Sequence, residues 1–279
     1  MSTLSNPGSG GPLSGFKGVS LAANIPGPVA AQLLRREGLS LVKVEPPAGD
    51  MLAGAAPALY RELTEGFQVQ TLDLRRADGQ ARFQELLHGA DLLITSQRPG
   101  ALHRLEVTQE NLAVLNPRLC WVEIVGDTEE PEVPGHDLTY QLQVGLVRPP
   151  QMPTTLLADL SGAQEAARAG LALLLGRERG GPERHRQVGL KQAAYALALP
   201  VRHGLTAPGG WLSGAQPEYR VYPLKDGWAG VAALEPHFAA RLRDTLGERT
   251  AEAFLANLNV EECNRLANEK DLPVHAVRD

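Results

Sequence analysis

Cysteine and aromatic residues are scarce in this sequence of 279 residues, and neither sign of charge is in large excess. The two cysteines, Cys120 and Cys263, are too few for a disulfide framework and are interpreted as reduced thiols. With 27 basic and 32 acidic residues the net charge is −5, which does not favour a nucleic-acid partner. Aromatic residues make up only 5%, while alanine, leucine and glycine are abundant, and this composition favours an α/β protein over an all-β sandwich.

Long hydrophobic runs are absent too, so the sequence predicts no helix that spans a membrane and no membrane partner. Residues 1–15 are rich in serine, glycine and proline and contain no apolar run, so they are not interpreted as a signal peptide. We expect them to form a flexible tail on a soluble, cytoplasmic protein. The length allows one large domain, or a large and a small one, with a sizeable core.

Strand and helix patterns alternate over the first half of the chain, which predicts a parallel sheet with helices on both faces. The run lacks a Gly-x-Gly-x-x-Gly, so nicotinamide or flavin binding is not expected. We interpret it as a Rossmann-like scaffold without that fingerprint. Strands are predicted at residues 16–23, 39–45, 67–74, 91–96 and 119–125, and helices at 29–37, 79–88 and 108–115.

The second half begins with two predicted helices, residues 160–177 and 187–203, joined by a charged loop. Beyond residue 204 the pattern changes to two short strands around Lys225–Gly227, which is a hairpin signal, followed by short helices and a last strand at 272–277. We therefore predict a tail at 1–15, a Rossmann-like large domain at 16–204 and a small α+β domain at 205–279.

His136 and Asp159 are the pair of residues that most suggests chemistry. They lie 159 − 136 = 23 residues apart, each at a predicted helix start, after the last predicted strand of the sheet. Ligands of parallel sheets bind outside the carboxyl ends of the strands. A histidine and a carboxylate that face one substrate atom make a two-base proton-transfer site. In isolation both also fit structural roles, Asp159 as a helix N-cap and His136 as a hydrogen-bonded turn residue.

Nine stretches, in order along nearly the whole chain, resemble the family III CoA-transferases and their relatives, the α-methylacyl-CoA racemases. The resemblance implies a CoA-binding Rossmann-like domain, an acyl-CoA substrate and an interlocked homodimer. The stretches are Gly11–Phe16, Gly27–Leu34, Leu41–Asp50, Leu72–Arg75, Ser96–Ala101, Asn116–Leu119, Pro134–Tyr140, Leu156–Gly162 and Tyr219–Phe238, the last including Lys225–Gly227.

The racemase branch is favoured by two details, the histidine at 136 and the Ala-Leu-Glu-Pro-x-Phe stretch that contains Glu235. The resemblance implies that His136 and Asp159 act on opposite faces of the substrate α-carbon and that Glu235 hydrogen-bonds His136. Asp159 also matches the transferase nucleophile, which forms an acyl anhydride. Because removal of a thioester α-proton requires a stabilised enolate, we expect the backbone amide of Asp137 to donate to the enolate oxygen.

Three arginines match positions at which the family contacts the CoA nucleotide: Arg75, Arg98 and Arg104. Arginine suits phosphate because of its forked donors, although arginines near turns are also common on surfaces. The resemblance implies that coenzyme A enters as part of the substrate, without a metal or redox cofactor.

The sequence departs from the family pattern around the expected CoA groove and at its end. Pro46 and Pro47 replace a basic residue, and residues 65–70 replace a basic run. The loop that is usually glycine-rich is here Gly126–Pro131, with carboxylates at Glu129, Glu130 and, just beyond, Glu132, which disfavour a polyanion. The sequence ends at Asp279, before the segment with which full-length members return to the large domain, so interlocking of a homodimer is left open.

Three functions are therefore left open. The first is an acyl-CoA racemase or epimerase, the second is a CoA-transferase with Asp159 as nucleophile, and the third is an inactive homologue that acts as a binding protein.

Overall fold

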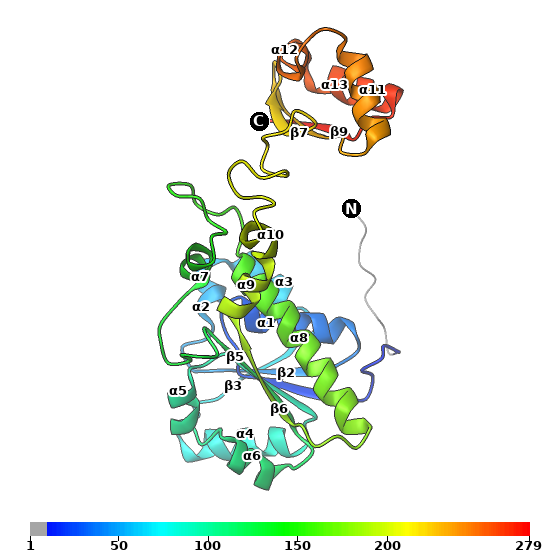
Figure 1. Ribbon diagram of the computed structural model, residues 1–279. Coiled ribbons are helices and arrows are strands. Elements are labelled where there is room, and N and C mark those ends of the chain that lie inside the picture. The colour runs from blue at the N-terminus through cyan, green and yellow to red at the C-terminus, as the bar shows by residue number, and fades with distance from the viewer. Residues whose placement is uncertain (1–9) are drawn as a thin grey trace. The chain divides into compact units, whose positions relative to one another are not determined.

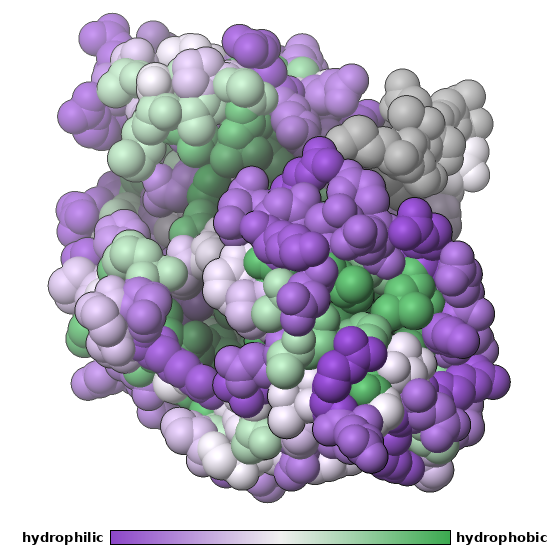
Figure 2. Space-filling view, turned by 90° about the horizontal axis from the view of Figure 1, so that it is seen from above, coloured by the Kyte–Doolittle hydropathy of each residue, from purple (hydrophilic) through white to green (hydrophobic). Residues whose placement is uncertain are grey.

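The computed structural model describes residues 10–279 and divides into two compact units, one ending at Leu197 and the other spanning Ala198–Asp279. The boundary predicted near residue 204 lies a few residues further along the chain. Figure 1 shows both units. In the space-filling view of Figure 2, hydrophilic residues make up most of the rim of the face that is shown.

A six-stranded sheet forms the centre of the first unit. All its pairs are parallel and the strand order is β3-β2-β1-β4-β5-β6, so the chain order reverses its direction between β1 and β4. This confirms the predicted Rossmann-like sheet. Its strands are β1 (Lys17–Ser20), β2 (Ser40–Glu45), β3 (Gln68–Thr71), β4 (Leu92–Thr95), β5 (Cys120–Val125) and β6 (His185–Gly189).

Helices cover both faces of this sheet, with α1 and α8 on one face and α4 and α6 on the other (Figure 1). The helices α2, α3 and α5 were not predicted. The helices of this unit are α1 (Pro26–Arg36), α2 (Met51–Ala55), α3 (Pro57–Thr64), α4 (Ala77–His88), α5 (Pro99–Arg104), α6 (Gln109–Leu115), α7 (Asp137–Gln143), α8 (Leu157–Glu178) and α9 (Leu190–Leu197).

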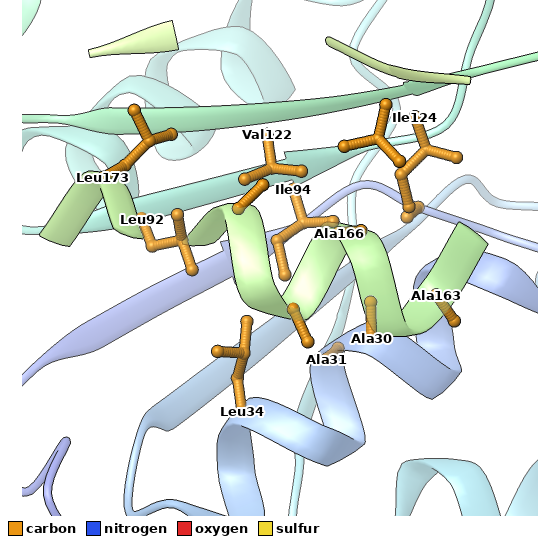
Figure 3. Close-up of a cluster of buried hydrophobic side chains, with 14 of the residues drawn as sticks. Ala30, Ala31, Leu34, Leu92, Ile94, Val122, Ile124, Ala163, Ala166 and Leu173 are labelled. Atoms are coloured by element: carbon orange, nitrogen blue, oxygen red, sulfur yellow. The ribbon is translucent and has the colours of Figure 1, made fainter. Parts of the chain in front are cut away.

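Small residues let α1 and α8 approach each other closely above the sheet. Figure 3 shows alanines of the two helices facing one another over the aliphatic side chains of β4 and β5. Alanine loses no side-chain entropy on burial and keeps the two backbones close, so the start of α8 has a defined position above the strand ends. The alanines labelled there are Ala30, Ala31, Ala163 and Ala166, each at most 1% exposed.

The prediction of a helix from residue 187 was wrong for its first residues. Gln187–Gly189 belong to β6, which pairs with β5 in the register Glu123↔Gln187, and α9 begins only at Leu190. The reason is a long-range contact that the local pattern does not reveal. His185 Nε2 and Gln187 Nε2 each lie 3.0 Å from a carboxylate oxygen of Glu123, a buried residue of β5.

The predicted flexible tail lies outside the described residues as far as residue 9. Residues 11–15, which were also assigned to it, form a turn that Leu13 anchors to the rest of the first unit. The backbone amide of Leu13 donates to the carbonyl of Glu37 at 2.8 Å, and the Leu13 side chain is 5% exposed. Burial of this apolar side chain stabilises the segment, although serine, glycine and proline surround it in the sequence.

The second unit is a three-stranded antiparallel sheet covered by helices. The hairpin predicted around Lys225–Gly227 is present as β7 and β8, and β9 pairs with β8 on its other side. The unit consists of α10 (Leu199–Arg202), β7 (Tyr219–Pro223), β8 (Gly227–Ala232), α11 (Pro236–Leu246), α12 (Ala251–Leu255), α13 (Val260–Lys270) and β9 (Val274–Arg278).

Each unit has one cysteine in its hydrophobic core. Cys120 is in β5 of the first unit and Cys263 is in α13 of the second, and neither is more than 1% exposed. Burial raises the pKa of both thiols, which are not bonded to each other.

Among residues 10–279, no helix combines the length and the hydropathy that crossing a bilayer requires.

Candidate functional site

A cavity of about 190 Å³ lies at the carboxyl ends of β1, β4 and β5, where the strand order reverses. This is the position at which open parallel sheets bind their ligands. Three of the predicted site residues line it: His136, Asp159 and Arg98. Its wall also includes the backbone turn after β1 at Ala23–Asn24, Ser96 after β4 and Gly126 after β5.

His136 is the N-cap residue of α7 and is exposed. Its backbone is fixed from both sides, because its amide donates to Thr139 Oγ1 at 3.1 Å and its carbonyl accepts from the same hydroxyl at 2.7 Å. The main chain of His136 is therefore anchored at a position where the residue lines the cavity, as a proton-transfer residue requires.

Asp159 lies in the first turn of α8 and is partly buried. Burial raises its pKa from 3.8 to about 7, and the nearby Asp137 carboxylate adds to the increase. A carboxyl group with a pKa near neutrality can donate or accept a proton under physiological conditions, which suits general acid–base catalysis.

Asp137 follows His136 but is not among the residues that line the cavity. Its carboxylate is 5% exposed and accepts a hydrogen bond from the backbone amide of Asp159 at 3.0 Å. Gln141 donates to its other oxygen at 2.5 Å. Sequence reasoning considered only the backbone amide of Asp137, whose role stays a prediction. The spacing of Asp137 and Gln141, one helical turn apart, was the available signal for the side-chain pair.

Tyr140 is a wall residue that sequence reasoning missed. It is 4% exposed, and burial together with the Asp127 and Asp159 carboxylates raises its pKa. The two glycines opposite its hydroxyl have no room for a side chain. A Cβ atom would come within 2.0 Å of this oxygen at Gly126 and within 2.3 Å at Gly135. The glycines therefore let the phenol lie directly against both ends of the segment that joins β5 to α7.

The acidic loop, residues 126–134, is held by hydrogen bonds at both ends. Asp127 is buried and accepts from Lys191 Nζ at 2.5 Å and Gln192 Nε2 at 2.6 Å. Although burial opposes it, these hydrogen bonds lower the pKa of Asp127. Glu132 accepts from the backbone amide of Gly100 at 2.5 Å. Two carboxylates of the loop, those of Asp127 and Glu132, therefore already accept hydrogen bonds from other groups of the chain.

Glu235 belongs to the second unit, where it is the exposed N-cap of α11 and precedes Pro236. Its predicted hydrogen bond with His136, which lies in the first unit, stays a prediction.

A second cavity, of about 370 Å³, lies beside the carboxyl ends of β1, β2 and β3. It is lined by Arg75, by Pro46 and Pro47, and by Gln97, whose neighbours Ser96 and Arg98 line the first cavity. Arg75 is highly exposed and pairs with Asp73 at 3.1 Å, so its guanidinium is accessible to a ligand. Arg104, at the end of α5, is exposed and lines neither of these cavities.

A buried ionic cluster adjoins the second cavity through Glu45, which is one of the residues that line it. Lys43 Nζ, with the residue 1% exposed, contacts a carboxylate oxygen of Glu45 at 2.5 Å and one of Asp50 at 2.6 Å. The Tyr60 hydroxyl donates to Glu45 at 2.9 Å, and burial raises the pKa of Tyr60 to about 12. The sequence suggested only a strand here, and this cluster was not predicted.

Among residues 10–279, no group of three or more histidine, cysteine, aspartate or glutamate side chains is arranged to hold a metal ion.

The chain matches the model of one protein family and is similar to several known proteins. The sequence model described as CoA-transferase family III matches residues 13–279. The chain is 29% identical over 212 residues to the probable fatty acyl-CoA transferase Rv3272 of Mycobacterium tuberculosis, covering 69% of this chain and 53% of that protein. It is 29% identical over 259 residues to human alpha-methylacyl-CoA racemase, covering 86% and 66%. It is 27% identical over 263 residues to succinyl-CoA–D-citramalate CoA-transferase of Chloroflexus aurantiacus, covering 85% and 65%.

The chain thus spans between about half and two thirds of the length of these relatives. Among solved structures, it resembles Rv3272 from M. tuberculosis with a TM-score of 0.82 at 24% identity, covering 96% of this chain and 84% of that one. A CAIB/BAIF family protein from Brucella suis gives a TM-score of 0.82 at 22% identity, with the same coverage. At these identities the structural likeness establishes the shared fold.

Proposed function

Because this chain belongs to CoA-transferase family III, we propose that it acts on an acyl-CoA thioester as a racemase or epimerase, moving a proton at the carbon next to the thioester carbonyl. The observation that carries the proposal is the single cavity in which His136 lies with Asp159, whose pKa is raised to about 7. A histidine and a carboxyl group whose pKa is raised to about 7 can exchange the roles of acid and base on the two faces of one carbon.

In this reaction the imidazole of His136 removes the α-proton and the neutral carboxyl of Asp159 returns a proton to the opposite face. The enolate formed between these steps needs hydrogen-bond donors at its oxygen. The backbone amide of Asp137 is proposed as one donor, since N–H groups in the first turn of a helix have no partner within the helix. Glu235 is proposed to orient His136 by hydrogen bonding to its ring.

A CoA-transferase with Asp159 as nucleophile is the second candidate, supported by relatives that are named as CoA-transferases. Only the ionised carboxylate attacks a thioester carbonyl. A pKa of about 7 leaves a large part of Asp159 protonated at neutral pH, which favours acid–base chemistry over nucleophilic attack. Homodimer formation and a cytoplasmic location stay predictions from the resemblance and the composition.

The decisive experiment is incubation with a 2-methylacyl-CoA in D₂O, with mass detection of the thioester and with succinate present as an acceptor of CoA. We expect one deuterium at the α-carbon and no succinyl-CoA. The His136→Ala variant is expected to exchange about 100-fold more slowly, because it lacks one of the two acid–base groups. Succinyl-CoA without deuterium would support the transferase instead. The absence of both products, together with no binding of the thioester, would support an inactive homologue.

Coenzyme A is proposed to enter as part of the substrate, with its nucleotide in the second cavity and its thioester in the first. The support is that Gln97 lines one cavity while Ser96 and Arg98 line the other, so the two adjoin along one turn. Arg75 has a forked, exposed guanidinium that can bind phosphate. Arg98 would contact the ligand between the cavities and Arg104 would contribute charge from the end of α5.

The Arg75→Gln variant is expected to bind acetyl-CoA about tenfold more weakly, as the loss of one charged hydrogen bond would cause. Calorimetric titration measures this directly. Arg76→Gln is the matched control, since Arg76 is a neighbouring exposed arginine that pairs with Asp78 and does not line the cavity. Equal weakening by both substitutions would indicate a general charge effect and would remove Arg75 from the site.

A further inference from the structure

The acidic loop forms one wall of the cavity at the strand ends, and it does so with apolar side chains. Pro131 and Val133 line the cavity. The backbone amide of Val133 donates to the carbonyl of Glu130 at 3.0 Å, which closes a turn around Pro131. The hydrogen bonds of Asp127 and Glu132 hold the two ends of the loop. A ligand in the cavity therefore meets apolar groups that project from a fixed main chain.

The neighbouring part of the wall is apolar too, and the space inside it is small. The cavity volume of about 190 Å³ is enough for on the order of six water molecules at about 30 Å³ each. A carboxylate carried into this space by an acyl group would lose most of its hydration and would need a cation as partner. The apolar residues of this part of the wall are Pro26, Ile124, Val125 and Leu190.

Cations are scarce around the cavity. Among the described residues that line it, Arg98 is the only lysine or arginine, and the proposed function assigns it to the ligand between the two cavities. Lys191, at the start of α9, contacts the Asp127 carboxylate at 2.5 Å. Asp127 first, and Glu129 and Glu130 after it, raise the pKa of Lys191. The ammonium of Lys191 is thus already compensated, while Glu129 and Glu130 are exposed and add negative charge to the loop.

We propose that the acidic loop determines specificity for the acyl group: Pro131 and Val133 contact an uncharged branched acyl group, and the carboxylates of the loop exclude acyl groups that carry a negative charge. The inference rests on the proposed function, which places the acyl group in this cavity. A carboxylate on the substrate would be repelled by Glu129 and Glu130. Discrimination between two ligands arises from such repulsion as well as from favourable contacts.

The test compares two thioesters that differ only at the far end of the acyl group, where a methyl in 2-methylbutanoyl-CoA is a carboxylate in 2-methylsuccinyl-CoA joined through its C1 carbonyl. Because the CoA part is the same, the ratio of the two Kd values isolates the effect of the acyl charge. In calorimetric titrations of the full chain we expect the uncharged thioester to bind about tenfold more tightly or better. The kcat/KM for α-deuterium exchange should follow the same order.

The Val133→Lys variant places a cation in the wall. Val133 is 53% exposed, so a lysine at this position can keep its ammonium in water. We expect the preference for the uncharged thioester to shrink about tenfold, because the new ammonium attracts the acyl carboxylate. The matched control is Val114→Lys, which adds the same charge at a valine of α6 that is 87% exposed and does not line this cavity. Its preference should equal that of the unmodified protein.

Equal binding of the two thioesters by the unmodified protein would overturn the proposal, and so would equal effects of the two lysine substitutions. If Val133→Lys does not fold, salt decides, because the preference of the unmodified protein must shrink between about 0.02 M and about 0.5 M NaCl as the loop carboxylates are screened. A preference that does not change with salt overturns the proposal. A preference in binding without α-exchange would refute the racemase and leave the role of the loop in place, whereas no binding of either thioester would overturn both.

Discussion

Replacing Asp159 by asparagine is expected to reduce α-exchange about 1,000-fold and, at the same time, to make the folded protein more stable at pH 8. The first effect follows from the loss of an acid–base group in the cavity. The second follows from the pKa of Asp159, which burial and the charge of Asp137 raise from 3.8 to about 7. Asparagine has nearly the same shape and needs no charge in this environment.

The direction of the stability effect follows from proton binding. The folded chain keeps a proton on Asp159 that the unfolded chain releases near pH 4, so the stabilisation present below pH 4 is lost as the pH rises to about 7. Above pH 7 the folded protein bears the full cost of an ionised Asp159. Three pH units correspond to about 4 kcal/mol, and partial exposure of the side chain reduces this to about 2 kcal/mol.

Urea unfolding of both proteins at pH 5 and pH 8 measures this difference. The gain in the free energy of unfolding should be larger at pH 8 than at pH 5. The control variant Glu110→Gln changes an exposed carboxylate at the start of α6 and should show neither the gain in stability nor the loss of α-exchange. A variant that is inactive but less stable at pH 8 would contradict the assigned environment of Asp159.

The Lys43→Met substitution is expected to destabilise the first unit by about 3–5 kcal/mol. Lys43 is 1% exposed and is the cation that contacts both Glu45 and Asp50. Without it, two carboxylates remain buried beside each other and beside the Tyr60 hydroxyl. Because domains are stable by only about 5–15 kcal/mol in total, this single change should bring the unit close to unfolding at room temperature.

The fluorescence of Trp121, which is buried in the first unit, reports the unfolding of that unit when Trp211 and Trp228 are replaced by phenylalanine. The matched control is the triple variant Lys43→Met, Glu45→Gln, Asp50→Asn, which removes all three charges and should regain most of the lost stability. An unchanged urea midpoint in the single variant would show that Lys43 is not needed to neutralise the two carboxylates.

The sheet and its helices could be predicted from the sequence because buried parallel strands have a local signature. All four residues of β4 and all six of β5 are buried, and most of them are apolar. The strand β6 has no such signature, since His185 and Gln187 are polar and owe their place to Glu123 across the sheet. Strand pairing over more than 60 residues is a property of the folded chain and not of a sequence window.

The candidate site, like the sheet, could be predicted from the sequence only in part. His136, Asp159 and Arg98 line one cavity because their segments all follow strands of the same sheet. The side-chain contact of Asp137 with Asp159 spans 22 positions in the sequence, and neither residue type reveals it. Lys43 and Glu45 stand in an alternating strand pattern that usually indicates one solvent-exposed face, and only the full structure shows that both are buried.

The pair of buried cysteines gives the protein two internal reporters of local opening. Each unit has one thiol, Cys120 or Cys263, that a reagent can reach only when the core around it opens. Labelling followed by proteolysis and mass spectrometry would therefore time the opening of each unit separately under native conditions. If the two cysteines react at different rates, the units open independently, and their stabilities can be ranked without denaturant.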